Sequence, residues 1–281
     1  MCYFEYKNTK VKITRRVRAT TIAMIMLSML AVNFRFVQAP IAEAFSGVGN
    51  GSTDFPFRIE TCEQLQEMES DHNASYILMN DIDCSASSSW NGGQGFAPIS
   101  GFSGIFDGQD HSIDQLAMTR TGITGNYFGL FARAMDATIK NVHLTNTNIQ
   151  AANNVGGIVG EAAHTIVSHV SVAGTVTGIS TVGGAIGMAD SDSTIENVGV
   201  TAAVTATNGG AGGVAHTASN TSIMNSYFNG TLSGTTGPNA GIVSNVTVFT
   251  GESNALQNNY STGTLNGDAD LAGLIGSIFI F

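Results

Sequence analysis

The sequence repeats itself about every 28 residues from position 128 to its end. Each repeat begins with a block of glycine and apolar residues, as at Gly157-Ile158-Val159, and a second block follows that opens on Ile, Val or Leu. The second blocks open at positions 139, 167, 195, 223 and 256, and the first four of these are spaced by 28. A fixed period of this length is typical of stacked units that bury their apolar faces only against their neighbours. The period therefore predicts a solenoid and favours a scaffold or binding role over catalysis.

Each repeat is predicted to contain three short strands. The glycine block forms the first strand, the second block opens the second, and the third lies about ten residues later. Apolar residues alternate within this stretch, as at Val142 and Leu144, which places one face of the strand inside. The predicted fold class is thus all-β: a parallel β-helix, or β-solenoid, with three-strand coils of about 28 residues. The recurring glycines are expected to provide positive φ angles at corners and close approach of backbones.

Asparagine recurs at one position of the second block. Because residues at the same offset lie above one another in a stack, their amides are expected to bond from layer to layer. The predicted structural ladder consists of Asn141, Asn197, Asn225 and Asn258.

Residues 1–44 have the organisation of an export signal. A basic segment over residues 1–18 precedes an apolar run over 19–34, and Ala42-Glu43-Ala44 then matches a cleavage site. Cleavage would leave four basic and 19 acidic residues, a net charge of −15, which disfavours nucleic acid and anionic lipid as partners. The alternative is an uncleaved N-terminal anchor, which would then be the one contact with a membrane. Either way, a secreted or cell-surface location is expected.

Residues 45–54 are rich in glycine and serine and are predicted to be a flexible start. Residues 55–127 lack the period and are predicted to form an N-terminal cap with the first coils. A short helix is expected from Thr61 to Ser70, because Thr61 and Gln64 have the spacing of a capping box. Cys62 and Cys84 are predicted to form a structural disulfide; the alternative is a pair of buried thiols.

Residues 128–281 are predicted to form the repeat region. They stop within a repeat on an apolar segment over 276–281, and no recognisable C-terminal cap is present. We therefore expect a solenoid that continues or is truncated there, or one that relies on a partner, since an open sheet edge invites pairing.

The densest polar cluster of the sequence includes Asp107, Asp110 and His111. Two carboxylates and an imidazole could carry acid–base chemistry, which gives the alternative of a polysaccharide-cleaving enzyme on a parallel β-helix. The competing interpretation is a turn, because Asp-Gly favours turns and Asp bonds locally to backbone. We prefer the turn, so no catalytic residue is expected in the main interpretation.

Three Asp-x-Asp pairs, which open at Asp81, Asp190 and Asp268, suggest calcium as a stabilising ion. None has the spacing of a complete calcium loop, so turns are the preferred interpretation and a calcium-stabilised scaffold is the second alternative. No metal site and no cofactor are predicted.

One loop, over residues 246–254, is about five residues longer than its counterparts. Insertions in solenoids often mark a binding face. Phe249 and Glu252 are therefore candidate contacts for a glycan or protein on a host or neighbouring cell. The alternative is that Phe249 covers the adjoining coil.

The repeat and its lead-in resemble a known family. The pattern glycine, apolar, apolar, glycine occurs at 157–160 and 273–276, and the lead-in includes Phe57-Arg58-Ile59, Tyr76-Ile77-Leu78 and Phe106-Asp107-Gly108. These segments are similar to the GLUG repeats of bacterial surface proteins, with departures at His216 and Ser244. The resemblance implies a β-helical, adhesin-like module of the kind that accompanies large exported adhesins and one class of immunoglobulin-cleaving metalloprotease. The metalloprotease motif H-E-x-x-H does not occur in the sequence, so the resemblance implies no catalytic residues. The function expected is an exported, non-catalytic module for adhesion or structural display.

Overall fold

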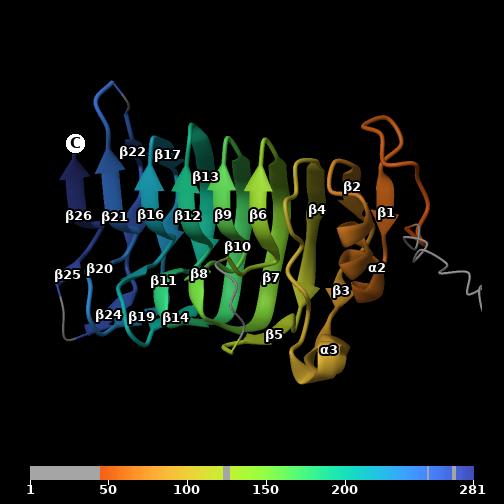
Figure 1. Cartoon of the computed structure of the whole chain (residues 1–281), viewed down its shortest axis with the longest axis horizontal. Coiled ribbons are helices and arrows are strands. Elements are labelled where there is room, and N and C mark those ends of the chain that lie inside the picture. The colour runs from red at the N-terminus through yellow and green to blue at the C-terminus, as the bar shows by residue number, and fades with distance from the viewer. Residues whose placement is uncertain (1–44, 123–126, 252, 268–269) are drawn as a thin grey trace, which may run out of the picture. The chain divides into compact units, whose positions relative to one another are not determined.

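The chain winds into a parallel β-solenoid of about seven turns (Figure 1). The computed structural model describes residues 45–122, 127–251, 253–267 and 270–281. The predicted all-β class and the coil spacing of about 28 residues are confirmed. The expected export signal at 1–44 lies outside the described residues, as do Glu252 and Asp268.

Three parallel sheets run along the solenoid. The largest has the order β1 (Phe57–Ile59), β2 (Ser75–Leu78), β4 (Ile105–Asp114), β7 (Thr138–Ala151), β10 (Ile166–Gly178), β13 (Ser193–Val200), β17 (Thr221–Met224) and β22 (Ala255–Gln257). Its side branches are β3 (Ile82–Asp83), β5 (Ala117–Arg120), β14 (Ala203–Ala206), β18 (Tyr227–Phe228), β19 (Thr231–Gly234), β23 (Tyr260–Ser261) and β24 (Thr264–Gly267).

The two smaller sheets complete each coil. One contains β6 (Phe131–Met135), β9 (Val159–Ala163), β12 (Ile186–Asp190), β16 (Ala215–Ser219), β21 (Val243–Val248) and β26 (Ile275–Ile280). The other contains β8 (Asn153–Val155), β11 (Ser180–Gly183), β15 (Ala211–Gly212), β20 (Asn239–Ala240) and β25 (Leu271–Ala272).

Strand boundaries within a coil differ from those expected. The expected second and third strands belong to one sheet, and in β7 and β10 they form one continuous strand. The glycine block is a corner rather than a whole strand, since β9 begins at Val159, the third residue of its block. The remaining sheet is made of strands that precede the glycine block, and two of them, β15 and β20, have two residues each.

The apolar columns follow the period of the sequence. Val167 pairs in register with Ile139 in the preceding coil and with Ile195 in the next, and Ile195 pairs with Ile223. All four side chains are fully buried. The core is therefore a continuous stack, in which each coil covers the apolar side chains of the one before it.

Single residues in the left-handed conformation keep apolar side chains facing the core where strict alternation would turn them outward. Ile139 and Val142 are both buried although they are three residues apart, which strict alternation would not permit. Asn141 lies between them with φ of 53° and has no register partner in β10. Residues with short polar side chains tolerate this conformation best. The same conformation recurs in later coils at His169, Asn197, Asn225 and Asn258.

The recurring glycines serve close approach and not positive φ. Gly157, Gly184 and Gly213 lack positive φ, so that part of the expectation is wrong for them. A Cβ on Gly157 would lie 2.7 Å from the carbonyl oxygen of Gly184, and one on Gly184 would lie 2.2 Å from that of Gly213. A side chain at these corners would push successive coils apart, which explains why glycine recurs there.

The N-terminal region contains two short helical segments between its first strands. The expected helix is confirmed as α2 (Cys62–Glu67), followed by the 3-10 turn η1 (Met68–Ser70). The Thr61 hydroxyl accepts a hydrogen bond from the Gln64 amide at 3.3 Å, and Leu65 and Met68 are fully buried. The second segment consists of η2 (Ser85–Ser89) and α3 (Trp90–Gly93).

The segment predicted as a flexible start lies against β1. Arg58 donates its amide hydrogen to the carbonyl of Val48 at 2.7 Å, and the ring of Phe45 packs 4.6 Å from that of Phe57.

Candidate functional site

The carboxylate of Asp107 interacts with polar side chains of the next coil. In strand β4, it accepts hydrogen bonds from the Gln109 amide at 3.0 Å and from Asn141 Nδ2 at 2.9 Å, and Lys140 Nζ lies 3.2 Å away. Burial alone would raise the pKa of Asp107, but these hydrogen bonds and the Lys140 charge outweigh it and hold the pKa below its ordinary value. An ionised carboxylate with these partners is not a proton donor at neutral pH.

The other two members of the predicted acid–base cluster have different surroundings. Asp110 is exposed and left-handed, with φ of 61°. His111 Nδ1 lies 3.3 Å from Asp81 Oδ1 of an earlier segment, and the same oxygen accepts the Ser112 amide at 2.8 Å. Among the described residues, no hydrogen bond joins Asp107, Asp110 and His111 to one another. The hydrogen bonds of Asp107 and Asp81 thus join successive segments of the chain.

The asparagine column has mixed partners. Asn258 Nδ2 donates to Asn225 Oδ1 at 3.1 Å, but Asn225 in turn reaches Glu196 Oε1 at 3.4 Å. Asn197 Nδ2 lies 3.2 Å from Nε2 of His169, which occupies the column between Asn197 and Asn141. The four asparagines therefore share a left-handed backbone and each contacts an earlier coil, and one such contact joins two members of the predicted ladder.

Phe249 follows strand β21 and is 45% exposed. Its ring stacks on that of Phe281, with centroids 5.6 Å apart and an interplanar angle of 25°. The Thr250 hydroxyl also donates to the Phe281 carbonyl at 2.9 Å. The loop is thus attached to the strand that follows in the stack, and Phe249 contributes to this contact.

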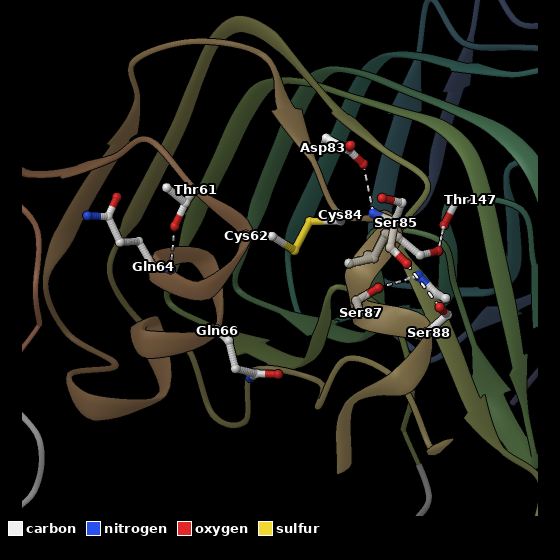
Figure 2. Close-up of a disulfide and its surroundings, with 12 residues drawn as sticks. Thr61, Cys62, Gln64, Gln66, Asp83, Cys84, Ser85, Ser87, Ser88 and Thr147 are labelled. Atoms are coloured by element: carbon white, nitrogen blue, oxygen red, sulfur yellow. Dashed lines mark hydrogen bonds between the residues drawn. A yellow bond between two sulfur atoms is a disulfide. The ribbon is translucent and has the colours of Figure 1, made fainter. Parts of the chain in front are cut away.

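The disulfide joins the two helical segments of the N-terminal region (Figure 2). Cys62 begins α2, and Cys84 immediately precedes η2; their Cα atoms are 5.2 Å apart and both side chains are buried. Asp83 supports the second segment by accepting the Ser85 amide at 2.8 Å. The link holds α2 close to the chain that continues into α3.

An open depression lies between α2 and α3. It is lined by Glu63, Gln66, Glu67, Trp90 and Asn91. No repeat or spacing in the sequence links the helix expected over residues 61–70 with Trp90. The predicted disulfide is the feature that could have linked them, since it brings residues 62 and 84 together.

Most amide groups at this depression already have partners. Gln66 donates from Nε2 to the Ala97 carbonyl at 2.9 Å, and its Oε1 accepts the Ala97 amide at 2.7 Å. Asn91 Nδ2 donates to the Gly95 carbonyl at 2.8 Å. Glu67 Oε2 accepts the Ser46 amide at 2.7 Å. These bonds fix the walls and leave mainly acceptor atoms and the Trp90 indole to face a ligand.

Within the described ranges, no group of three or more His, Cys, Asp or Glu side chains is placed to hold a metal ion. No helix of the described chain is long and apolar enough to cross a membrane.

Comparisons with known proteins give one relative and one structural neighbour. No family model matches the chain, so the GLUG resemblance stays a prediction. Over 155 residues, or 51% of this chain, the sequence is 37% identical to halomucin of Haloquadratum walsbyi, but this match covers 2% of halomucin. A crystal structure of a candidate immunoglobulin A1 protease from Bacteroides ovatus has a TM-score of 0.62 at 18% identity, over 82% of this chain and 86% of that one. This second likeness concerns the fold alone.

Proposed function

We propose that this chain is an exported, non-catalytic β-solenoid that serves in surface display or adhesion. The observation that carries the proposal is the use of Asp107, the best candidate acid of the sequence, in contacts between coils. Its carboxylate is ionised and bonded to Asn141 and Lys140, which is a structural role. A scaffold needs such contacts in every layer, whereas a glycosidase needs two convergent carboxyl groups, one of them protonated.

The location rests on three further supports. The likeness to part of halomucin favours a surface or secreted protein. The segment over residues 1–44 has the pattern of an export signal. The GLUG resemblance of the repeats also favours the surface of a cell. We infer that the partner in adhesion is a glycan or protein of a neighbouring or host cell.

The location is tested on intact cells of the organism that makes the protein. Antibodies raised against residues 45–281 are expected to label unpermeabilised cells or the culture medium, and external protease is expected to remove the cell-bound signal. Labelling that requires permeabilised cells would contradict the proposal. An antibody to an internal protein serves as the control for leakage.

The absence of catalysis is tested on a panel of acidic and neutral polysaccharides. We expect no new reducing ends with either the wild type or Asp107→Asn. Cleavage that the wild type performs and Asp107→Asn loses would restore the enzyme hypothesis.

A further inference from the structure

We propose that the depression between α2 and α3 binds an arginine side chain of a partner protein. The first support is its aromatic wall. Trp90 is the one tryptophan of the sequence, it packs partly buried against the core, and it lines the depression. Among the aromatic side chains, tryptophan attracts cations most strongly over its ring. A large aromatic side chain at an open depression is therefore suited to a cationic group.

The second support is the charge of the helix beside it. Glu63 and Glu67 are one helical turn apart on α2 and both line the depression. Neither takes part in an ion pair with another described residue. The positive charge that would complement these carboxylates is thus not provided by the described chain, and a ligand can provide it.

The third support is the balance of donors and acceptors. Gln66 and the Asn91 amino group are bonded to backbone. Among the lining side chains, the polar atoms with no hydrogen bond to another described residue are the Glu63 carboxylate, Glu67 Oε1 and Asn91 Oδ1, with the indole N–H as the donor. An anionic ligand would meet repulsion there, and a sugar hydroxyl would find few donors. A guanidinium has only donors, is planar, stacks on aromatic rings and binds carboxylates through two parallel bonds.

The fourth support is that the walls are fixed before binding. The disulfide holds α2 beside the segment that leads to Trp90, and the Gln66 amide forms two bonds to Ala97. A preformed site spends less of its interaction energy on ordering. This inference rests on the proposed adhesive function, for which it names the partner chemistry.

The test is calorimetric titration of the full chain with short peptides. Acetyl-Gly-Arg-Gly-amide is compared with the lysine peptide and with the citrulline peptide, which has nearly the shape of arginine without its charge. We expect millimolar binding of the arginine peptide, several-fold weaker binding of the lysine peptide and none of the citrulline peptide. Binding is expected to weaken as NaCl rises, because exposed charges are screened.

Variants locate the site. Trp90→Leu and Glu63→Gln are each expected to weaken binding of the arginine peptide about fivefold. Glu60→Gln is the matched control, because Glu60 is exposed, precedes α2 and does not line the depression. If Trp90→Leu lowers the thermal midpoint, Glu63→Gln and the salt dependence decide the result.

Three results would overturn the proposal: no binding of the arginine peptide up to ~10 mM, equal binding of the citrulline peptide, or unchanged binding in Glu63→Gln. Displacement of the arginine peptide by a neutral oligosaccharide would instead assign the depression to glycans. Because these titrations use purified protein, they stand apart from the location. Arginine binding by a protein found only inside cells would sink the surface role and leave the site.

Discussion

At the scale of the residue, left-handed backbone conformations decide which side chains face the core. Asn197 has φ of 54°. Ile195, two positions before it, and Val198, directly after it, are both buried. Without the left-handed residue, one of these two apolar side chains would turn to the outside. The asparagine column therefore has a conformational role in addition to its hydrogen bonds.

This role predicts different effects of two substitutions at Asn197. Both Asn197→Ala and Asn197→Gly lose the contact with His169. The alanine variant also carries the steric cost of the left-handed conformation, about 1–2 kcal/mol, which glycine avoids. Urea unfolding should therefore show a lower free energy of unfolding for the alanine variant than for the glycine variant. Equal stability of the two would show that the amide contact alone matters.

His216 predicts how stability depends on pH. Its side chain in β16 is 8% exposed, and burial lowers its pKa to about 4. The unfolded chain binds a proton near pH 6.5 and the folded chain does not, so stability is full above pH 6.5 and falls as the pH drops toward 4. The loss can reach about 3 kcal/mol at the lower limit. Urea unfolding at pH 7 and pH 4.5 should show a smaller loss for His216→Gln, and an equal loss in both proteins would contradict the assignment.

At the scale of the element, the disulfide decides whether α2 and the segment before α3 stay together. It closes a segment of 22 residues, for which the chain-entropy model gives a stabilisation of roughly 3 kcal/mol. The double variant Cys62→Ser, Cys84→Ser should lose about this amount in urea unfolding. Hydrogen exchange should increase most in residues 57–97. Reductant should destabilise the wild type and leave the double variant unchanged; an effect on both would point elsewhere.

The individual elements also show which parts of the fold could be predicted from the sequence. The period predicted the coil, the buried columns and their register, and the capping-box spacing predicted α2. The sheet of β8, β11, β15, β20 and β25 was missed, since strands of two to four residues carry no alternation to recognise. The proximity of Glu63 and Trp90 depends on the fold, and no repeat or spacing reveals it. The predicted disulfide is the one feature of the sequence that brings their two segments together.

At the scale of the whole molecule, the excess of acidic over basic residues affects stability. Residues 45–281 carry a net charge of −15, which opposes the compact state by self-repulsion. Raising NaCl from ~0.05 to ~1 M should therefore raise the thermal midpoint, by ~5 °C for this size of chain. A chelator at constant ionic strength should leave the midpoint unchanged. A midpoint that responds to the chelator would support the calcium-stabilised scaffold, and one that ignores NaCl would contradict the electrostatic argument.

The strict register between coils makes the height of this molecule a quantity that changes in whole steps. Val167 and Ile195 are 28 residues apart and occupy the same column. Deletion of the 28 residues that lead from one to the other would therefore leave the columns aligned. A duplication or deletion of one full repeat would add or remove a layer of ~4.8 Å. A loop can accept extra residues, as over residues 246–254, but a change that shifts a strand within its sheet would move glycines away from their corners. A gene of this kind can thus change the length of its product by gaining or losing whole repeats, while the core of each coil stays the same.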